Sequence, residues 1–129
     1  MKITGVIDFV FPGNSFIGPK EYQVIAKDKS VYENIGIFAY QWNDGNLPNS
    51  GGNIELVNVS DDEIDLVSYS NSFNWPTSAD GQGFSLELRN PDDENLATQN
   101  WRVSNMVGGT PGNANKLTIN NLLCINEIQ

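Results

Sequence analysis

The chain has 129 residues, enough for one domain with one hydrophobic core, and its 7 Lys and Arg against 16 Asp and Glu give a net charge of −9. A chain this acidic repels phosphate backbones, so nucleic acid is excluded as an expected partner. Histidine is absent and Cys124 is the single cysteine, which excludes Ser-His-Asp and Cys-His catalysis, imidazole-bearing metal sites and an intramolecular disulfide.

Short apolar stretches bounded by turn residues recur along the chain, while no long stretch keeps apolar residues at helical spacing. Strands are predicted at 6–11, 22–27, 37–42, 53–59, 64–70, 84–88, 101–104 and 117–128. The polar residues SDDE between the fourth and fifth of these predict a hairpin. One helical turn is expected in KDKSVYENIG, with Ser30 as the N-cap and Glu33 three positions later. Together these elements predict an all-β fold, an antiparallel β-sandwich.

No apolar run approaches the roughly 20 residues that a membrane-spanning helix needs, so membrane insertion is not expected. The first residues also lack the uninterrupted apolar core and small-residue cleavage pattern of a signal peptide.

Several spaced motifs in the second half of the chain resemble the lamin tail domain, in the version found in bacterial extracellular proteins. The matching positions are Trp75-Pro76, Asp80 to Glu87, Asn90 to Asn95, Asn100-Trp101, and Gly108 to Gly112 followed by Asn115. The resemblance implies an immunoglobulin-like sandwich. It also implies an extracellular or cell-surface location, and an accessory, spacer or protein-interaction role within a larger protein.

The order of these motifs departs from the family at the two ends of the chain. The family begins with a strand of the form Ile-Asn-Glu-Ile, whereas here Phe11-Pro12 comes almost at once and Ile-Asn-Glu-Ile stands at 125–128. We therefore expect a sandwich over 1–115. Residues 116–129 are a linker and strand that either completes this sandwich or begins a following domain. In the first case residues 122–128 pair with the sandwich, with Cys124 or Ile125 facing the core, in a monomer or by strand exchange in a dimer.

The remaining motifs predict structure more readily than chemistry. Trp75, Trp101, Leu86 and Leu88 are expected to anchor the core. The two acidic loops, SDDEID at 60–65 and NPDDEN at 90–95, offer oxygen ligands of the kind that calcium prefers. The candidate ligands are Asp92, Asp93 and Asn95, with Asp80. The simpler interpretation, which we adopt, is that these side chains bond turn backbones. No cofactor is expected, and paired carboxylates for glycoside hydrolysis are the last alternative.

The sequence thus favours a non-catalytic interaction or spacer module and predicts no catalytic residue. The alternative is a ligand-binding module that takes calcium through the acidic loops, or carbohydrate through exposed aromatic residues such as Tyr32, Tyr40 and Trp42.

Overall fold

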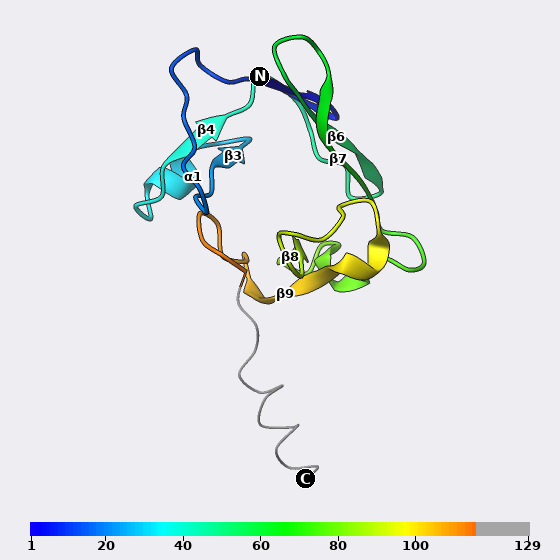
Figure 1. The fold of residues 1–129 in the computed structure, drawn as a ribbon. Helices are drawn as coiled ribbons and strands as arrows, with labels where there is room; N and C mark the ends of the chain where they lie inside the picture. The colour runs from blue at the N-terminus through cyan, green and yellow to red at the C-terminus, as the bar shows by residue number, and fades with distance from the viewer. Residues whose placement is uncertain (116–129) are drawn as a thin grey trace.

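The computed structural model describes residues 1–115, which form mainly short strands and very little helix (Figure 1). The strands are β1 (Lys2–Gly5), β2 (Ile7–Val10), β3 (Val24–Ala26), β4 (Ala39–Gln41), β5 (Asp44–Gly45), β6 (Gly51–Val57), β7 (Glu63–Ser70), β8 (Phe84–Leu88) and β9 (Trp101–Val107). The helical turns are α1 (Ser30–Glu33), η1 (Thr77–Ala79) and η2 (Thr98–Asn100). The predicted predominance of β-structure is confirmed. Strands β1 and β5 were not predicted, and the strand predicted at 117–128 lies outside the described residues.

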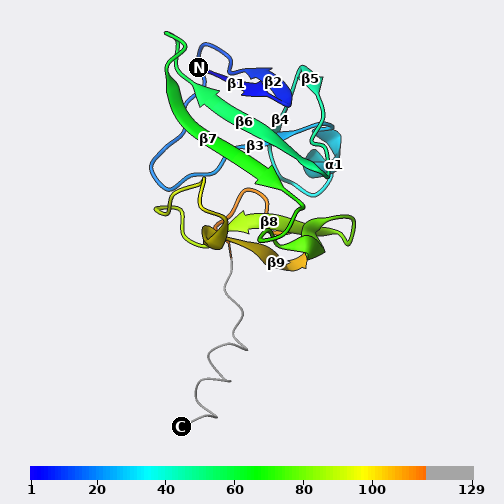
Figure 2. The same cartoon turned by 90° about the vertical axis from the view of Figure 1, so that its right-hand side faces the viewer.

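The strands form one large antiparallel sheet and two pairs (Figures 1 and 2). The large sheet has the order β5-β2-β1-β6-β7, and β8 pairs with β9 antiparallel. In contrast to the antiparallel expectation, β3 and β4 pair in parallel. The reason is the connection 27–38, which contains α1 and brings the chain back to its starting end, as a parallel pair requires. Figure 2 shows the β8–β9 pair below β7.

Strand β2 carries the clearest alternation, and it connects the large sheet to the β3–β4 pair. Ile7 and Phe9 are each 5% exposed, whereas Asp8 and Val10 face solvent. The ring of Phe9 lies 5.4 Å from that of Tyr40 on β4, a distance typical of favourable aromatic pairs. The backbone N–H of Asn43, just after β4, donates to the Asp8 carbonyl at 2.8 Å, so the chain passes directly from the pair to the edge of the large sheet.

The β6–β7 hairpin confirms the turn predicted at SDDE. Its connection is held by the side chain of Asn58, whose Oδ1 accepts from the backbone N–H groups of Ser60 at 2.7 Å and Asp62 at 3.0 Å. Asn is common in turns because its side-chain amide can replace a backbone hydrogen-bonding partner in this way. The hairpin is therefore closed by a side chain at the end of β6 as well as by strand pairing.

The helical turn α1 forms where it was predicted, but its predicted cap is wrong. Lys29 occupies the N-cap position and makes no side-chain cap bond. Asp28 Oδ1 instead accepts from both the backbone N–H of Ser30 at 3.0 Å and its hydroxyl at 2.6 Å. The Asp28 carboxylate, two residues before Ser30, is a stronger acceptor than the serine hydroxyl, so Ser30 donates where it was expected to accept.

At Gly5, the backbone of β1 lies so close to the backbone of β6 that a side chain has no space. Its φ is +109°, and a Cβ there would press against the Asn53 carbonyl oxygen. Gly5→Ala is expected to lower the free energy of unfolding by about 2 kcal/mol, measured by urea denaturation, because both the backbone angle and the space disfavour a side chain. Gly13→Ala is the matched control, since nothing lies within 4 Å of a Cβ there. Equal stability of the two variants would contradict this account.

Candidate functional site

The register of the β8–β9 pair gives it one apolar and one polar face. Leu86 lies opposite Val103 and Leu88 opposite Trp101 on the first face. The second face carries the pair formed by Glu87 and Arg102. Successive side chains of a strand point to opposite faces, so this register fixes both sets at once. The apolar face contributes to the pocket described below.

Two tryptophans meet on the apolar face. The rings of Trp75 and Trp101 lie 6.1 Å apart at 43°, and the Trp101 indole N–H donates to the Asn95 carbonyl at 2.8 Å. The predicted burial is confirmed for Trp75, which is 9% exposed, whereas Trp101, Leu86 and Leu88 are only half-buried. Leu86 and Trp101 are only half-buried because both line a pocket.

We call this hollow, of about 380 Å³, the inter-sheet pocket. It lies between the β6–β7 part of the large sheet and the β8–β9 pair. Its lining is mainly apolar and comprises Leu47, Pro48, Asn49, Ile54, Val67, Tyr69, Ser70, Asn71, Pro76, Ala79, Asp80, Leu86 and Trp101. Ile54 and Val67 are cross-strand partners, and Val67 and Tyr69 share one face of β7. The volume falls within the range of about 300 to 1,000 Å³ typical of ligand sites.

The polar groups that line the inter-sheet pocket are acceptors, amides and hydroxyls rather than cations. The Tyr69 hydroxyl donates to the Pro48 carbonyl at 2.8 Å, and burial raises the pKa of this phenol above its ordinary value. Asp80 Oδ2 accepts from the Asn71 amide at 3.0 Å. Because the described lining includes Asp80 and no Lys or Arg, its electrostatics favour a neutral or cationic group over an anion.

The polar face of the β8–β9 pair carries an ion pair that the sequence did not predict. Glu87 is 6% exposed, and its Oε1 accepts from Arg102 Nε and Nη2, each at 3.0 Å. Gly109, in the turn after β9, lies against Ser85 and Ser104 on this face. No local pattern in FSLEL indicates that Glu87 is buried, because its burial depends on pairing with Arg102 across the strands.

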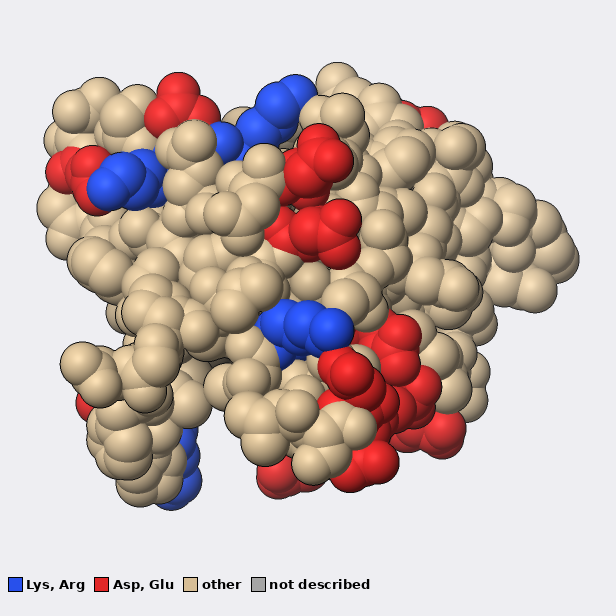
Figure 3. All heavy atoms as spheres, turned by 90° about the horizontal axis from the view of Figure 1, so that it is seen from above, with Lys and Arg blue, Asp and Glu red and all other residues tan. Residues whose placement is uncertain are grey.

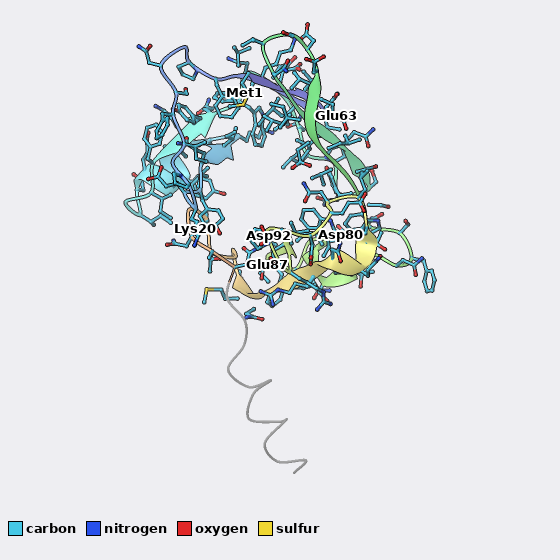
Figure 4. The ribbon with its side chains drawn as sticks, viewed as in Figure 1. Met1, Lys20, Glu63, Asp80, Glu87 and Asp92 are labelled. Carbon is cyan, nitrogen blue, oxygen red and sulfur yellow. The ribbon has the colours of Figure 1, made fainter. Side chains whose placement is uncertain are left out.

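The calcium candidates have different hydrogen-bonding surroundings, and two of them, Asp80 and Asp92, are labelled in Figure 4. Asp80 lines the pocket, whereas the backbone N–H groups of Asp92 and Asp93 close a turn on Asn90. The Asn95 amide donates to Asp65 Oδ2 at 2.5 Å and so connects the loop after β8 to strand β7. In the part of the chain that the structure describes, no three carboxylates or thiols gather as metal ligands.

The acidic β6–β7 loop also contacts the N-terminal strand. Asp61 Oδ1 lies 2.8 Å from Lys2 Nζ. Seen from above, acidic side chains gather at one corner of the molecule (Figure 3).

The aromatic residues proposed for sugar stacking are not exposed platforms, which corrects that expectation. Tyr32, Tyr40 and Trp42 are all half-buried. Tyr40 packs among Phe9, Phe11 and Phe38. The Trp42 indole N–H donates to the Gly45 carbonyl at 3.1 Å. The β4 region uses its aromatic residues for packing because they connect the parallel pair to the large sheet.

Among residues 1–115, the helical turns are too short and too polar to span a membrane. No protein-family model, curated protein or solved structure matches this chain.

The Glu87–Arg102 pair predicts a charge-specific effect on stability. Glu87→Gln keeps the side-chain volume but removes the charge, and it is expected to lower the free energy of unfolding by about 2 kcal/mol. Urea denaturation measures the change. Glu63→Gln, at an exposed position at the start of β7, is the control and should change stability by less than about 0.5 kcal/mol. A Glu87 variant as stable as the control would show that the ion pair contributes nothing.

The Lys2–Asp61 contact predicts a measurable pKa. The ammonium group holds the pKa of Asp61 below its ordinary value of 3.8, chiefly through a hydrogen bond and then by charge. The stability that this adds is present above the unfolded carboxyl's pKa and is lost as pH falls through the folded value. Lys2→Met should raise the pKa of Asp61 in an NMR titration. The pKa of Asp28, lowered by Ser30, should not move. If the pKa of Asp61 is the same in Lys2→Met and in the wild type, the Lys2–Asp61 contact is refuted.

Proposed function

We propose that this chain is a non-catalytic, immunoglobulin-like sandwich module of the lamin tail kind that binds a partner protein within a larger exported or cell-surface assembly. Residues of the lamin-tail-like motifs make structural contacts with one another and with β8, which supports this assignment. Trp75 and Trp101 form a contacting pair, and Asn115 bonds to the end of β8. The exported or surface location follows from the family resemblance.

The inter-sheet pocket is the observation that carries the binding role. A pocket of about 380 Å³ with Ile54, Val67 and Trp101 in its lining accepts a bulky apolar side chain. Buried aromatic or aliphatic anchors that fill such pockets supply most of the energy of many protein interfaces.

Charge narrows the class of partner. Asp80 is exposed at the pocket and accepts a bond from Asn71 through Oδ2. The chain as a whole carries −9, which attracts a basic partner at long range. The preferred ligand is therefore a peptide segment with a large apolar residue beside a Lys or Arg. The apolar side chain fills the pocket and the cation approaches Asp80.

Selection of short random peptides on the 129-residue chain tests this function. We expect the selected peptides to share an apolar residue next to a basic one, and titration calorimetry to give their affinity. Val67→Trp should abolish binding by filling the pocket. Asp80→Asn should weaken binding about fivefold or less, because an exposed ion pair contributes about 1 kcal/mol or less.

Val59→Trp is the matched control, since Val59 is 90% exposed and does not line the pocket. Peptides that bind the wild type, Val67→Trp and Val59→Trp chains equally would exclude the pocket as the binding site. Selected peptides without a basic residue would reject the assigned partner class.

A further inference from the structure

Strand β7 is an edge strand of the large sheet, and its register identifies the backbone groups that face outward. Within residues 1–115, β7 pairs with β6 alone. The Asn53 carbonyl of β6 accepts from the Val6 N–H at 2.9 Å, so Asn53 directs its backbone groups toward β1. Ser68 lies opposite Asn53, and hydrogen-bonded and non-hydrogen-bonded pairs alternate along an antiparallel ladder. Ser68 therefore directs its N–H and C=O to the open edge, whereas Val67 directs its own to β6.

One half of β7 carries features that protect an open edge, and the other half lacks them. Proteins protect edges with bulges, inward-pointing charges, Lys or Pro. The register with β6 shifts between Glu63 and Asp65, and the Asp65 side chain lies on the inner face together with Val67. Asp65 Oδ1 also accepts from the outward backbone N–H of Leu66 at 2.9 Å. Residues 66–70, in contrast, contain no charged side chain and no proline, so this half of the edge is open to pairing.

The unprotected half of β7 lies beside the inter-sheet pocket. In Figure 2, β6 lies above β7 and the β8–β9 pair lies below it, and the pocket is lined by Val67 on β7 and Trp101 on β9. A residue directly opposite Val67 on an added strand would direct its side chain to the same face, into the pocket. Its two neighbours would then lie opposite Leu66 and Ser68, whose backbone groups face the open edge.

The charges at this edge match the peptide class of the proposed function. Asp65 is exposed at one end of the open half. At the other end, Asp80 accepts a hydrogen bond from Asn71, the residue that follows β7. Neither β7 nor the described lining of the pocket contains Lys or Arg. A strand that carries an apolar residue and a basic residue therefore meets a carboxylate at either end of the pairing.

We propose that the peptide of the proposed function binds as an antiparallel strand on the outer edge of β7, where it pairs with residues 66–70 while its apolar side chain fills the inter-sheet pocket. All pairs in the large sheet are antiparallel, and this arrangement is the more stable one per residue. In strand addition of this kind, main-chain hydrogen bonds supply affinity and pockets for alternate side chains supply specificity. The inference rests on the proposed function and adds to it the conformation of the bound peptide.

Single N-methylation of the peptide backbone tests the pairing, because it removes one N–H and leaves every side chain in place. The probe is the tightest-binding peptide from the selection, methylated at one amide at a time and titrated by calorimetry. Its apolar residue lies opposite Val67, where the peptide's backbone groups point away from β7, so methylation there should change the affinity by less than about threefold. Methylation of the amide on either side removes a bond to β7 and should weaken binding at least roughly tenfold.

Ser68→Pro makes the matching change on the protein. Its N–H faces the open edge, which is where an edge strand accepts proline, so the variant should fold and bind the peptide at least roughly tenfold more weakly. Ser68→Ala keeps the N–H and should bind as the wild type does. Hydrogen exchange on the wild-type chain gives a test that needs no variant. The Ser68 N–H should exchange at least roughly tenfold more slowly with saturating peptide.

The outcomes separate this inference from the proposed function. If Val67→Trp blocks a peptide whose affinity does not alternate along the methylation series, strand pairing is overturned and the pocket assignment stands. Sensitivity at the apolar residue with tolerance on both sides of it would overturn antiparallel pairing and indicate a parallel strand. A selection that yields no peptide blocked by Val67→Trp would overturn the proposed function and this inference with it.

Discussion

The register between β8 and β9 is the constraint on which the rest of this end of the molecule depends. By placing Leu86 opposite Val103 and Leu88 opposite Trp101, it gathers the apolar side chains on the face that lines the inter-sheet pocket. The same register buries Glu87 against Arg102 on the other face. A slip of one residue would exchange these faces and place an ion pair in the apolar pocket, where desolvation is costly.

The large sheet depends on a second, independent set of contacts. Phe9 on β2 packs against Tyr40 on β4, and the chain then enters β5 within a few residues. This aromatic contact allows a parallel pair of only three residues per strand to stay attached to an antiparallel sheet. The aromatic residues in and around β4 thus contribute packing, and the inter-sheet pocket is a place where apolar side chains line an open volume.

Several acidic side chains accept hydrogen bonds or form an ion pair within the fold, in addition to giving the chain its net negative charge. Asp28 accepts hydrogen bonds from Ser30 at the start of α1, and Asp61 pairs with Lys2. Asp65 accepts a bond from Asn95 and so ties the β6–β7 hairpin to the loop after β8. Each carboxylate satisfies a nearby donor, which is the common fate of Asp and Asn in turns. The charge that remains exposed favours basic partners.

The sequence alone determined the positions of most strands, because period-2 alternation and turn residues are local signals. IDFV shows this in β2, where Ile7 and Phe9 are buried and Asp8 and Val10 are exposed. It also determined the β6–β7 hairpin, whose connection is closed by Asn58 and by pairing between sequence neighbours.

Only the tertiary structure decided what depends on contacts between distant segments. The burial of Glu87 requires Arg102, fifteen positions away, to stand opposite it. The parallel pairing of β3 with β4 depends on how the connection through α1 packs. The inter-sheet pocket combines Pro48 from the loop before β6 with Val67 on β7 and Trp101 on β9. Residue type and spacing determine which side chains of a strand share a face. The residue that each side chain contacts in another strand or sheet is determined by the packing of the whole chain.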